Sequence, residues 1–427
     1  MHIKGFGLTD VGRKRDHNED SVLLDAELGL FVVADGMGGH AAGEVASSHA
    51  VQAIRSVIVA KQDVFEDFTA ADSHETRERL ITTVEGALQR ACAEIFSLAT
   101  KDQGKAGMGT TLTMMLVVGD KALMAHVGDS RLYLVRHGQL HQLSEDHSYC
   151  SEMIKRGKMT REEARQSPYS NVITRAVGIQ ASVQVDTLLF DIIPNDTFLL
   201  CSDGLHGYMD DPNELVEILT EGTGDKAPSK LIDLANGRGG RDNITALVVR
   251  VESEAGAVAE EDRRAQEVNL KLETLKKIPL FRHLTYQELV KVLNITYLEN
   301  HEAGSVIIRE SEEGAELYVV LAGTVTVMKG GQYITDLGAG VHFGEMALID
   351  QSPRSATIAA KETTRVLVVG RRAFYNLIRK EPVLAVKLLW SFVQVLSRRL
   401  RETNEQLTGA RSELEQIQQV PFLEIDE

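Results

Sequence analysis

The stretch FVVADGMGGHAAGEV, residues 31–45, decides the fold of the N-terminal half of the chain. FVVA is a short, β-branched run closed by Asp35 and Gly36, a pattern typical of a buried strand. From Ala41 onward the residues return to helical spacing. The glycines in between allow positive φ angles or a close approach of the backbone to a bound group. The stretch therefore predicts a strand, a tight turn and a helix, with Asp35 either as a helix cap or as part of a site.

Composition limits the classes of function that the chain can have. Its 427 residues exceed the usual size of one hydrophobic core, so two domains are expected. It contains 46 Lys and Arg against 62 Asp and Glu, a formal net charge of −16. Because surfaces that bind nucleic acids or anionic membranes are basic, neither is expected as a partner. Divalent cations and basic proteins are compatible with this charge.

Cysteine use and hydropathy point to the cytoplasm. The N-terminal residues lack the apolar core of a signal peptide, and no apolar run approaches the roughly 20 residues that span a bilayer. The three cysteines, Cys92, Cys150 and Cys201, lie far apart in the sequence and form no CxxC pair. A disulfide framework or a zinc site is therefore not expected, and a reducing compartment is.

The pattern of strands and helices changes once along the chain. Short apolar runs alternate with helical stretches in the first part, a small and charged segment follows, and strand runs separated by Gly then begin again. The predicted organisation is a first domain at 1–252, a linker and helix at 253–277, a second domain at 278–401, and a helical extension with a tail at 402–427. Residues 144–178 interrupt the first domain as a helical insert, in which Thr160 and Glu163 form a plausible capping box.

Carboxylates recur at the ends of the predicted strands, each beside a Gly or another polar residue. They are Asp35, Asp129, Asp203 and Asp242, with Arg15, Glu19 and Asp20 ahead of a further apolar run. Any single one of them fits a cap or a turn. One edge of a folded β core could gather all of them, and there they would repel one another unless cations neutralised them. Oxygen ligands without Cys or a paired His suit Mg²⁺ or Mn²⁺ rather than zinc.

Six motifs carry a resemblance to a known family. RDHNED, ADGMGGHAAGEV, GMGTTLT, HVGDSR, LLCSDGL and GRDNIT resemble, in order and spacing, those of the PPM-type metal-dependent serine/threonine protein phosphatases, especially the bacterial members. The resemblance covers about residues 1–252. It implies a β-sandwich flanked by helices, with metal ions in a cleft at one end, and phosphoserine or phosphothreonine proteins, the products of a serine/threonine kinase, as substrates.

The same resemblance implies a role for each carboxylate. Asp35 looks like the residue that bridges two Mn²⁺ or Mg²⁺ ions, and the carbonyl of Gly36 looks like a further ligand. Asp203 and Asp242 are similar to ligands of the second ion. Asp129 with Asp203 resembles a third, weaker metal site. The glycine after Asp35 would then be needed because a backbone carbonyl must approach a cation.

Three further residues complete the implied active site. Asp20 and its neighbour Glu19 are similar to residues that reach metal-bound waters. Arg15 looks like the guanidinium that clamps the substrate phosphate, a task for which bidentate geometry favours Arg over Lys. Eukaryotic relatives place a histidine directly after the Asp-Gly pair as a candidate general acid, and here that position is Met37. His40 is the nearby candidate acid; a metal-bound water in that role, with His40 at the surface, is the alternative.

The insert at 144–178 corresponds to the flap that lies beside the active site in this family. We expect it to influence the choice of protein substrate. Without the resemblance, a solvent-exposed helical excursion explains it equally well.

The stretch FGEMALIDQSPRSATI, residues 343–358, is the informative part of the second domain. Gly344 allows close backbone approach, and EMAL begins a short helix whose free N–H groups favour an anion. Pro353 is expected to stop that helix, and Arg354 then adds a positive charge. A solvated loop is the alternative. The string nevertheless resembles the phosphate-binding cassette of cyclic nucleotide-binding domains, over about residues 278–401.

By this second resemblance, Glu345 looks like the acceptor for the ribose 2′-hydroxyl and Arg354 like the partner of the cyclic phosphate. Gly344, Ser355 and Ala356 would add backbone or hydroxyl contacts. Because Ser355 stands where some members carry Ala and others Thr, both cAMP and cGMP stay open as effectors. The expected fold class is α+β: an α-β-β-α sandwich first, then a β-roll domain with flanking helices.

A long helix with a heptad pattern is expected after this domain. Its seam positions are Val386, Leu389, Val393, Leu396, Leu400, Leu407, Leu414 and Ile417, with Thr403 and Ala410 as weak members. Such a seam predicts a parallel homodimer. Alternatively, the first half of the helix packs on its own domain and the second half frays. No helix-turn-helix pattern follows, so DNA reading is not expected.

The sequence thus predicts a cytoplasmic protein phosphatase whose activity is tuned by a cyclic nucleotide. One rival is a scaffold that has lost catalysis and only reports nucleotide binding. The other is a phosphatase whose C-terminal domain senses a different effector.

Overall fold

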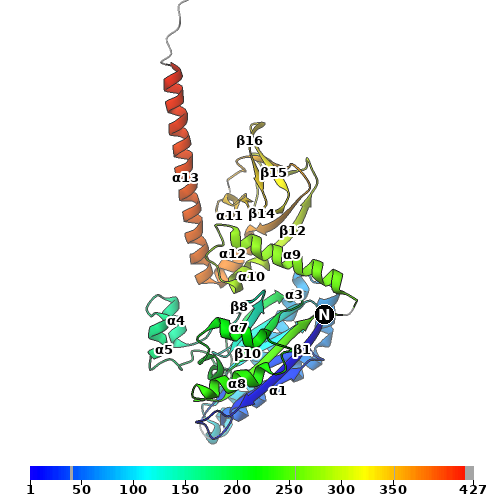
Figure 1. Cartoon of the computed structure of the whole chain (residues 1–427), viewed down its shortest axis with the longest axis vertical. Helices are drawn as coiled ribbons and strands as arrows, with labels where there is room; N and C mark the ends of the chain where they lie inside the picture. The colour runs from blue at the N-terminus through cyan, green and yellow to red at the C-terminus, as the bar shows by residue number, and fades with distance from the viewer. Residues whose placement is uncertain (39–41, 255, 351, 419–427) are drawn as a thin grey trace, which may run out of the picture. The chain divides into compact units, whose positions relative to one another are not determined.

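The computed structural model describes residues 1–38, 42–254, 256–350 and 352–418. Contacts divide the chain into two compact units, Met1–Val268 and Asn269–Glu427 (Figure 1). The division falls within a single helix, α9 (Val258–Lys277). The domain boundaries drawn from the sequence at 252, 277 and 401 stay predictions.

The first unit is built on two antiparallel sheets. One contains, in spatial order, β1 (His2–Asp10), β11 (Ile244–Glu252), β10 (Thr197–Cys201), β7 (Arg131–Arg136) and β8 (Gln139–Gln142). The other contains β2 (Asp20–Asp25), β3 (Leu30–Met37), β5 (Leu112–Val118), β6 (Lys121–Val127) and β9 (Asp186–Asp191), and β4 (Gly109–Thr110) also pairs with β3. Phe190 of one sheet and Phe198 of the other lie with ring centroids 5.7 Å apart. The two sheets therefore pack face to face.

Helices cover both outer faces of this sandwich. The first set consists of α1 (Ala42–Ala60), α2 (Gln62–Ala70) and α3 (His74–Lys101), followed by the short turn η1 (Gln103–Lys105). These helices bury Ile54, Leu88 and neighbouring apolar residues against the sheet that contains β3. The second set, α6 (Asp203–His206), α7 (Pro212–Thr220) and α8 (Ala227–Gly237), covers β10 and β11. The predicted α-β-β-α sandwich is confirmed.

Strand β3 is longer than the sequence pattern predicted. It does not end at Asp35 but continues to Met37, and Gly36 pairs with Thr110 of β4. A Cβ on Gly36 would lie 2.2 Å from the carbonyl oxygen of Gly43 and 2.5 Å from that of Glu19. Glycine is therefore required here because two backbone segments pass too close for any side chain.

The insert at 144–178 contains two short helices, α4 (Tyr149–Lys155) and α5 (Arg161–Gln166). The predicted capping box is present: Thr160 Oγ1 accepts from the Glu163 amide, and Glu163 Oε2 accepts from the Thr160 amide at 2.7 Å. We call residues 144–178 the flap from here on.

Two more antiparallel sheets form the second unit, each with four strands. One is ordered β12 (Thr296–His301), β19 (Thr364–Gly370), β14 (Glu316–Ala322), β17 (His342–Phe343), and the other β13 (Val306–Ile308), β18 (Thr357–Ala360), β15 (Thr324–Lys329), β16 (Gln332–Gly338). Val320, Val325 and Val368 lie in the core between them. The flanking helices are α10 (Tyr286–Leu293), α11 (Met346–Ile349), α12 (Arg371–Lys380) and α13 (Pro382–Gln418). This is the predicted β-roll with flanking helices.

One detail of the cassette differs from the prediction. Helix α11 ends at Ile349, and the extended residue Asp350 follows it. Pro353 lies beyond this end, so it does not stop the helix.

Helix α13 runs without a break from Pro382 to Gln418 (Figure 1). One face of its first half is buried in its own unit, where Leu384, Leu388 and Phe392 are at most 4% exposed. The opposite face carries exposed apolar side chains: Val386, Leu389, Trp390, Val393, Leu400 and Leu407 are each more than half exposed. The side chains of Leu414 and Ile417 lie outside the described part of the chain.

All three cysteines are free and buried. Among the described residues, none of the helices combines the length and apolar character that crossing a bilayer requires.

Candidate metal centre and nucleotide pocket

The predicted carboxylates come together at one end of the sandwich. Asp20 on β2 and Asp35 on β3 are direct partners across the two strands, so their side chains project from the same face. Asp203 follows β10 as the first residue of α6, and Asp242 lies two residues before β11. Asp129 follows β6 after a turn at Gly128. Both sheets therefore contribute acidic side chains to the same end.

Asp20 is held by two hydroxyl groups. Ser202 Oγ and Thr245 Oγ1 both donate to Asp20 Oδ2, at 2.8 and 2.6 Å. The other oxygen, Oδ1, is buried and has no hydrogen-bond partner within the described structure. Burial raises the pKa of Asp20 to about 7, and the charges of Asp203 and Asp242 add to the rise, although the two hydroxyl groups oppose it. A buried acceptor without a donor is costly, and a cation would satisfy it.

The other carboxylates repel one another in the same way. Burial, and then the charges of the neighbouring aspartates, raise the pKa of Asp35 well above its ordinary value. Burial and Asp203 raise the pKa of Asp129 to about 8. Burial and Asp242 raise the pKa of Asp203. In each case burial disfavours the charged form most, and the neighbouring carboxylates add to it, so a cation at this site would stabilise the ionised aspartates.

The predicted phosphate clamp lies at the rim of this cluster. Arg15 Nη2 donates to Asp242 Oδ2 at 2.8 Å, and its side chain is half exposed. Glu19 lies close by, and burial raises the pKa of its carboxyl group. His40 falls outside the described residues, so its predicted role is not addressed by the structure.

The donor set fits hydrated magnesium or manganese ions. Nowhere in the described ranges do three His, Cys, Asp or Glu side chains converge to hold a single ion by themselves. Mg²⁺ keeps several waters and is bound through one or two carboxylates, so it does not need such a cage. Pairs of aspartates with water and a backbone carbonyl are therefore the ligand sets that this site offers.

Three residues that support the site were not assigned a role from the sequence. Ser202 and Thr245 hold Asp20, as described above. Asn243 ties the loop before β2 to β11: its Nδ2 donates to the carbonyls of Val11 and His17, and its Oδ1 accepts from the Glu19 amide at 2.8 Å. All three stand inside or next to the motifs LLCSDGL and GRDNIT. The available signal was a small polar residue directly beside Asp203 and Asp242, namely Ser202 and Asn243; Thr245 had no such neighbour.

The second unit forms a compact arrangement around Arg354. Gly344 has a φ of 76°, and a Cβ there would lie 2.7 Å from Arg354 Nη1. The Arg354 side chain is 8% exposed; its Nη1 donates to the carbonyls of Glu316 at 3.0 Å and Gly344 at 3.2 Å. Glycine at 344 therefore lets the guanidinium lie beneath the backbone.

The remaining predicted nucleotide contacts surround this arginine. Glu345 directly precedes α11 and is buried. Ser355 is exposed and Ala356 half-buried. Glu316 was not predicted as part of this site, yet its Oε2 lies 3.2 Å from Arg354 Nη2. Arg354 thus already has an anionic partner from its own chain.

Comparison with known proteins agrees with this description of the first unit. Residues 12–230 match the family Protein phosphatase 2C. The Serine/threonine phosphatase stp of Listeria monocytogenes is 38% identical over 245 residues, which is 56% of this chain and 93% of that protein. Protein phosphatase PhpP of Streptococcus pneumoniae is 38% identical over 252 residues, 58% of this chain and 97% of that protein.

Solved structures give the same result. The serine/threonine phosphatase PstP/Ppp of Mycobacterium tuberculosis aligns with a TM-score of 0.53 at 33% identity, covering 59% of this chain and all of that one. A structure of the catalytic domain of PstP in complex with two manganese ions aligns with a TM-score of 0.50 at 32% identity. The alignment covers 59% of this chain and 99% of that one.

The second unit has its own match, since residues 298–381 match the family Cyclic nucleotide-binding domain. The chain therefore belongs to the protein phosphatase 2C family, as a protein serine/threonine phosphatase that carries a cyclic nucleotide-binding domain after its catalytic domain.

Proposed function

We propose that the first unit hydrolyses phosphoserine and phosphothreonine in proteins with the help of two Mn²⁺ or Mg²⁺ ions, and that a third ion binds more weakly between Asp129 and Asp203. The observation that best supports this proposal is the buried aspartate cluster with its unpartnered Asp20 Oδ1. The relative PstP, crystallised with two manganese ions, supports the same number of tightly bound ions.

Each residue has a distinct task in this proposal. Asp35 would supply carboxylate oxygens to the ions and the carbonyl of Gly36 would be a further ligand, while Asp203 and Asp242 would hold the second ion. Bound ions of this kind supply a nucleophilic water of lowered pKa and offset the charge that develops on the phosphoryl group. Asp20, fixed by Ser202 and Thr245, would accept a hydrogen bond from water in the site.

Arg15 would bind the substrate phosphate. Its guanidinium now donates to Asp242, at the exposed rim of the cluster, where an incoming phosphate can exchange with that carboxylate. The fork geometry of Arg suits two parallel hydrogen bonds to phosphate oxygens. The protonation of the leaving serine or threonine oxygen is assigned to His40 or to a water in the site.

We infer that the second unit binds cAMP or cGMP and that this binding tunes the phosphatase. Arg354 would bind the cyclic phosphate and Glu345 the ribose hydroxyl, with Gly344, Ser355 and Ala356 as further contacts. A nucleotide shifts activity only by as much as it prefers one state of the protein over another. Helix α9 supports such coupling, because it belongs to both units.

The anchoring of α9 on the first unit is specific. Arg264 Nη1 donates to the carbonyl of Ile192 at 2.8 Å, its Nε lies 2.6 Å from Asp120 Oδ2, and its Nη2 lies 3.2 Å from Asp191 Oδ1. Asp120 directly precedes β6, the strand whose other end leads to Asp129. A movement of α9 would therefore act on a strand that ends at the metal cluster.

The substrates proposed are phosphoproteins made by a serine/threonine kinase of the same cytoplasm. Three buried free thiols accord with a reducing compartment. We also propose a homodimer through α13, on the evidence of its exposed apolar face.

The proposed reaction is tested by hydrolysis of p-nitrophenyl phosphate by the full chain. Activity should require Mn²⁺ or Mg²⁺, disappear with EDTA, and fall by at least 100-fold in Asp203→Asn, whereas the exposed Asp233→Asn should behave as wild type. An inactive but folded wild-type protein that binds nucleotide would instead support a sensing scaffold.

The proposed regulation is tested by calorimetric titration with cAMP and cGMP, using Arg354→Ala as the negative control. Binding with a change in phosphatase rate supports it. If neither nucleotide binds the wild type, the second unit senses another effector.

A further inference from the structure

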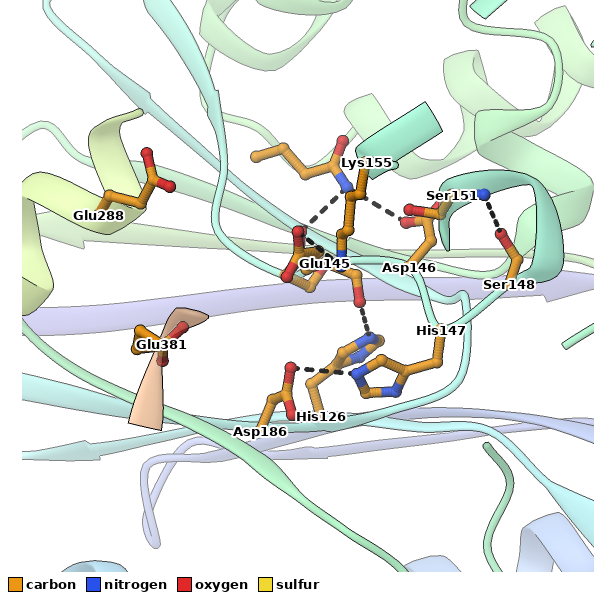
Figure 2. Close-up of polar contacts among 12 residues, drawn as sticks. His126, Glu145, Asp146, His147, Ser148, Ser151, Lys155, Asp186, Glu288 and Glu381 are labelled. Carbon is orange, nitrogen blue, oxygen red and sulfur yellow. Dashed lines mark hydrogen bonds and ion pairs between the residues drawn. The ribbon is translucent and has the colours of Figure 1, made fainter. Parts of the chain in front are cut away.

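The N-terminal part of the flap contains a buried histidine, His147, which contacts the backbone next to the aspartate cluster. His147 is 4% exposed, although it lies two residues before α4, whose surface is open to solvent. Figure 2 shows its ring joined to Asp186 by a dashed line and lying beside the ring of His126, whose centroid is 4.9 Å away. Ser148 caps α4 directly after it, by accepting a hydrogen bond from the Ser151 amide.

His147 holds Gly128 at two points. The amide of Gly128 donates to His147 Nδ1 at 3.1 Å, and the amide of His147 donates to the Gly128 carbonyl at 2.7 Å. Gly128 has a φ of 111°, and a Cβ there would lie 2.6 Å from the Thr111 side chain. Both backbone groups of Gly128 are thus engaged by one residue, and the next residue in the chain is Asp129.

The ring of His147 is in a defined tautomer. Because Nδ1 accepts from an amide, the proton of the neutral ring sits on Nε2, which lies 3.1 Å from Asp186 Oδ2 and also 3.1 Å from Arg175 Nη1; only the carboxylate can accept that proton's hydrogen bond. Burial alone would raise the pKa of Asp186, but the hydrogen bond from His147 and the charge of Arg175 lower it below its ordinary value. Asp186 therefore stays ionised and keeps the Nε2 proton on its side of the ring.

The carboxylate of Asp186 also binds the C-terminal part of the flap. Arg175 Nη1 donates to Asp186 Oδ1 at 2.8 Å, and the amide of Thr174 donates to the His147 carbonyl at 2.7 Å. Both ends of the flap, residues 147 and 174–175, thus converge on Asp186 at the start of β9. The flap and the Asp129 turn share His147 as a common support.

We propose that His147, oriented by Asp186, is a positioning residue that fixes the Asp129 carboxylate for the weakly bound cation and ties the flap to that site. This inference rests on the proposed function. Outer partners of metal ligands typically change metal affinity by about 10- to 100-fold when they are removed. The His147 ring would not touch the ion; it would set where Asp129 stands.

Two substitutions separate the two ring nitrogens. In His147→Asn, the amide oxygen can stand near the position of Nδ1 and accept from Gly128, but the side chain is too short to reach Asp186. In His147→Gln, the amide nitrogen can donate to Asp186, but nothing accepts from Gly128. His147→Gln should therefore weaken the most weakly bound Mn²⁺ by about 10- to 100-fold, whereas His147→Asn should keep that affinity.

The measurement is Mn²⁺ binding to the metal-depleted full chain, counted by electron paramagnetic resonance of the free ion. A second readout is the rate of tryptic cleavage within the flap, where Lys158 and Arg161 are exposed. Cleavage should be faster in His147→Asn, because residue 147 of the flap can no longer form the hydrogen bond to Asp186. The fully exposed His74→Asn serves as the matched control.

The outcomes are distinct. If the wild type binds no Mn²⁺, the proposed function fails together with this inference. If the wild type binds ions and folded His147→Gln binds all of them with unchanged affinity, the inference alone is overturned. Should His147→Gln fail to fold, His147→Asn decides: retained ions with faster flap cleavage support the inference, and loss of the weak ion contradicts it.

Discussion

Asp20 and Asp35 face each other directly across β2 and β3, so two carboxylates occupy adjacent positions on one sheet face. Like charges placed opposite each other destabilise a sheet, and burial increases the cost. This unfavourable pair lies at the end of the sandwich where Asp129, Asp203 and Asp242 also lie. This local conflict is the strongest structural sign of a cation site.

The conflict predicts an unusual pH dependence of stability. The pKa is raised to about 7 in Asp20 and to about 8 in Asp129, so each group stabilises the metal-free fold in its protonated form. That contribution is lost as the pH rises through these values. Because the ordinary pKa of an aspartate is 3.8, the melting temperature of the metal-free chain should fall as the pH rises from about 4 to about 8 and level off above that. Saturating Mg²⁺ should remove most of the fall, and Asp20→Asn should reduce it; a pH-independent melting temperature without metal contradicts the argument.

Substitution of Arg15 by Lys tests the phosphate clamp. The positive charge remains but the fork is lost, so KM for p-nitrophenyl phosphate should rise about tenfold, the loss of roughly one charge-assisted hydrogen bond. The metal requirement should not change. Steady-state kinetics of Arg15→Lys are compared with Arg13→Lys, which alters an exposed arginine of the same loop. Equal KM values in both variants would place the clamp elsewhere.

His40→Ala addresses the general acid. If His40 protonates the leaving oxygen, turnover should drop modestly on a phosphoserine peptide and little on an aryl phosphate, whose leaving group is less basic. Large and equal losses on both substrates would point to a structural role instead.

Glu316 should limit nucleotide affinity. Its carboxylate lies 3.2 Å from Arg354 Nη2, where it would compete with a nucleotide phosphate for the same guanidinium. Glu316→Gln should therefore bind cAMP or cGMP about 5- to 10-fold more tightly in calorimetry, since a neutral amide competes less well. Glu313→Gln, an exposed neighbour, is the control. Weaker binding in Glu316→Gln would mean that the carboxylate orients Arg354 for the nucleotide.

The exposed face of α13 should pair with a second copy of the chain. Leu389, Val393 and Leu400 are more than half exposed and fall on predicted seam positions, with the half-buried Leu396 between the last two. Light scattering at micromolar concentration should give a dimer, and Val393→Glu combined with Leu400→Glu should give a monomer. Glu402→Gln, outside the seam, should stay dimeric. A monomeric wild type contradicts the prediction.

Local sequence patterns were sufficient for much of the fold. Short apolar runs located β5, β6 and β11 because buried strands are nearly continuous in apolar residues. The end of β3 was misplaced, because Asp35 and Gly36 read as a turn when only the local sequence is considered. Gly36 is in fact a strand residue crowded by the carbonyls of Gly43 and Glu19, a contact that no local pattern contains.

The charged residues of the site could be predicted from the sequence, but the residues that hold them in place by hydrogen bonds could not. Aspartates at strand ends are visible in the sequence, whereas the residues that hold them act across more than 180 positions, as Ser202 does on Asp20. From the local sequence alone, Asn243 is indistinguishable from an ordinary turn residue and Glu316 from an ordinary strand residue. Their partners, in the loop before β2 and at Arg354, become neighbours only after the sheets have formed.

The burial of every thiol has a practical consequence for redox experiments. Burial raises the pKa of Cys201 to about 12 and that of Cys92 above its ordinary value, so neither side chain offers an appreciable amount of the reactive thiolate. Peroxide or alkylating reagents should thus find little to attack in the folded phosphatase. Loss of activity on oxidation would therefore need a target other than these two thiols, and storage without a reducing agent should leave both of them reduced.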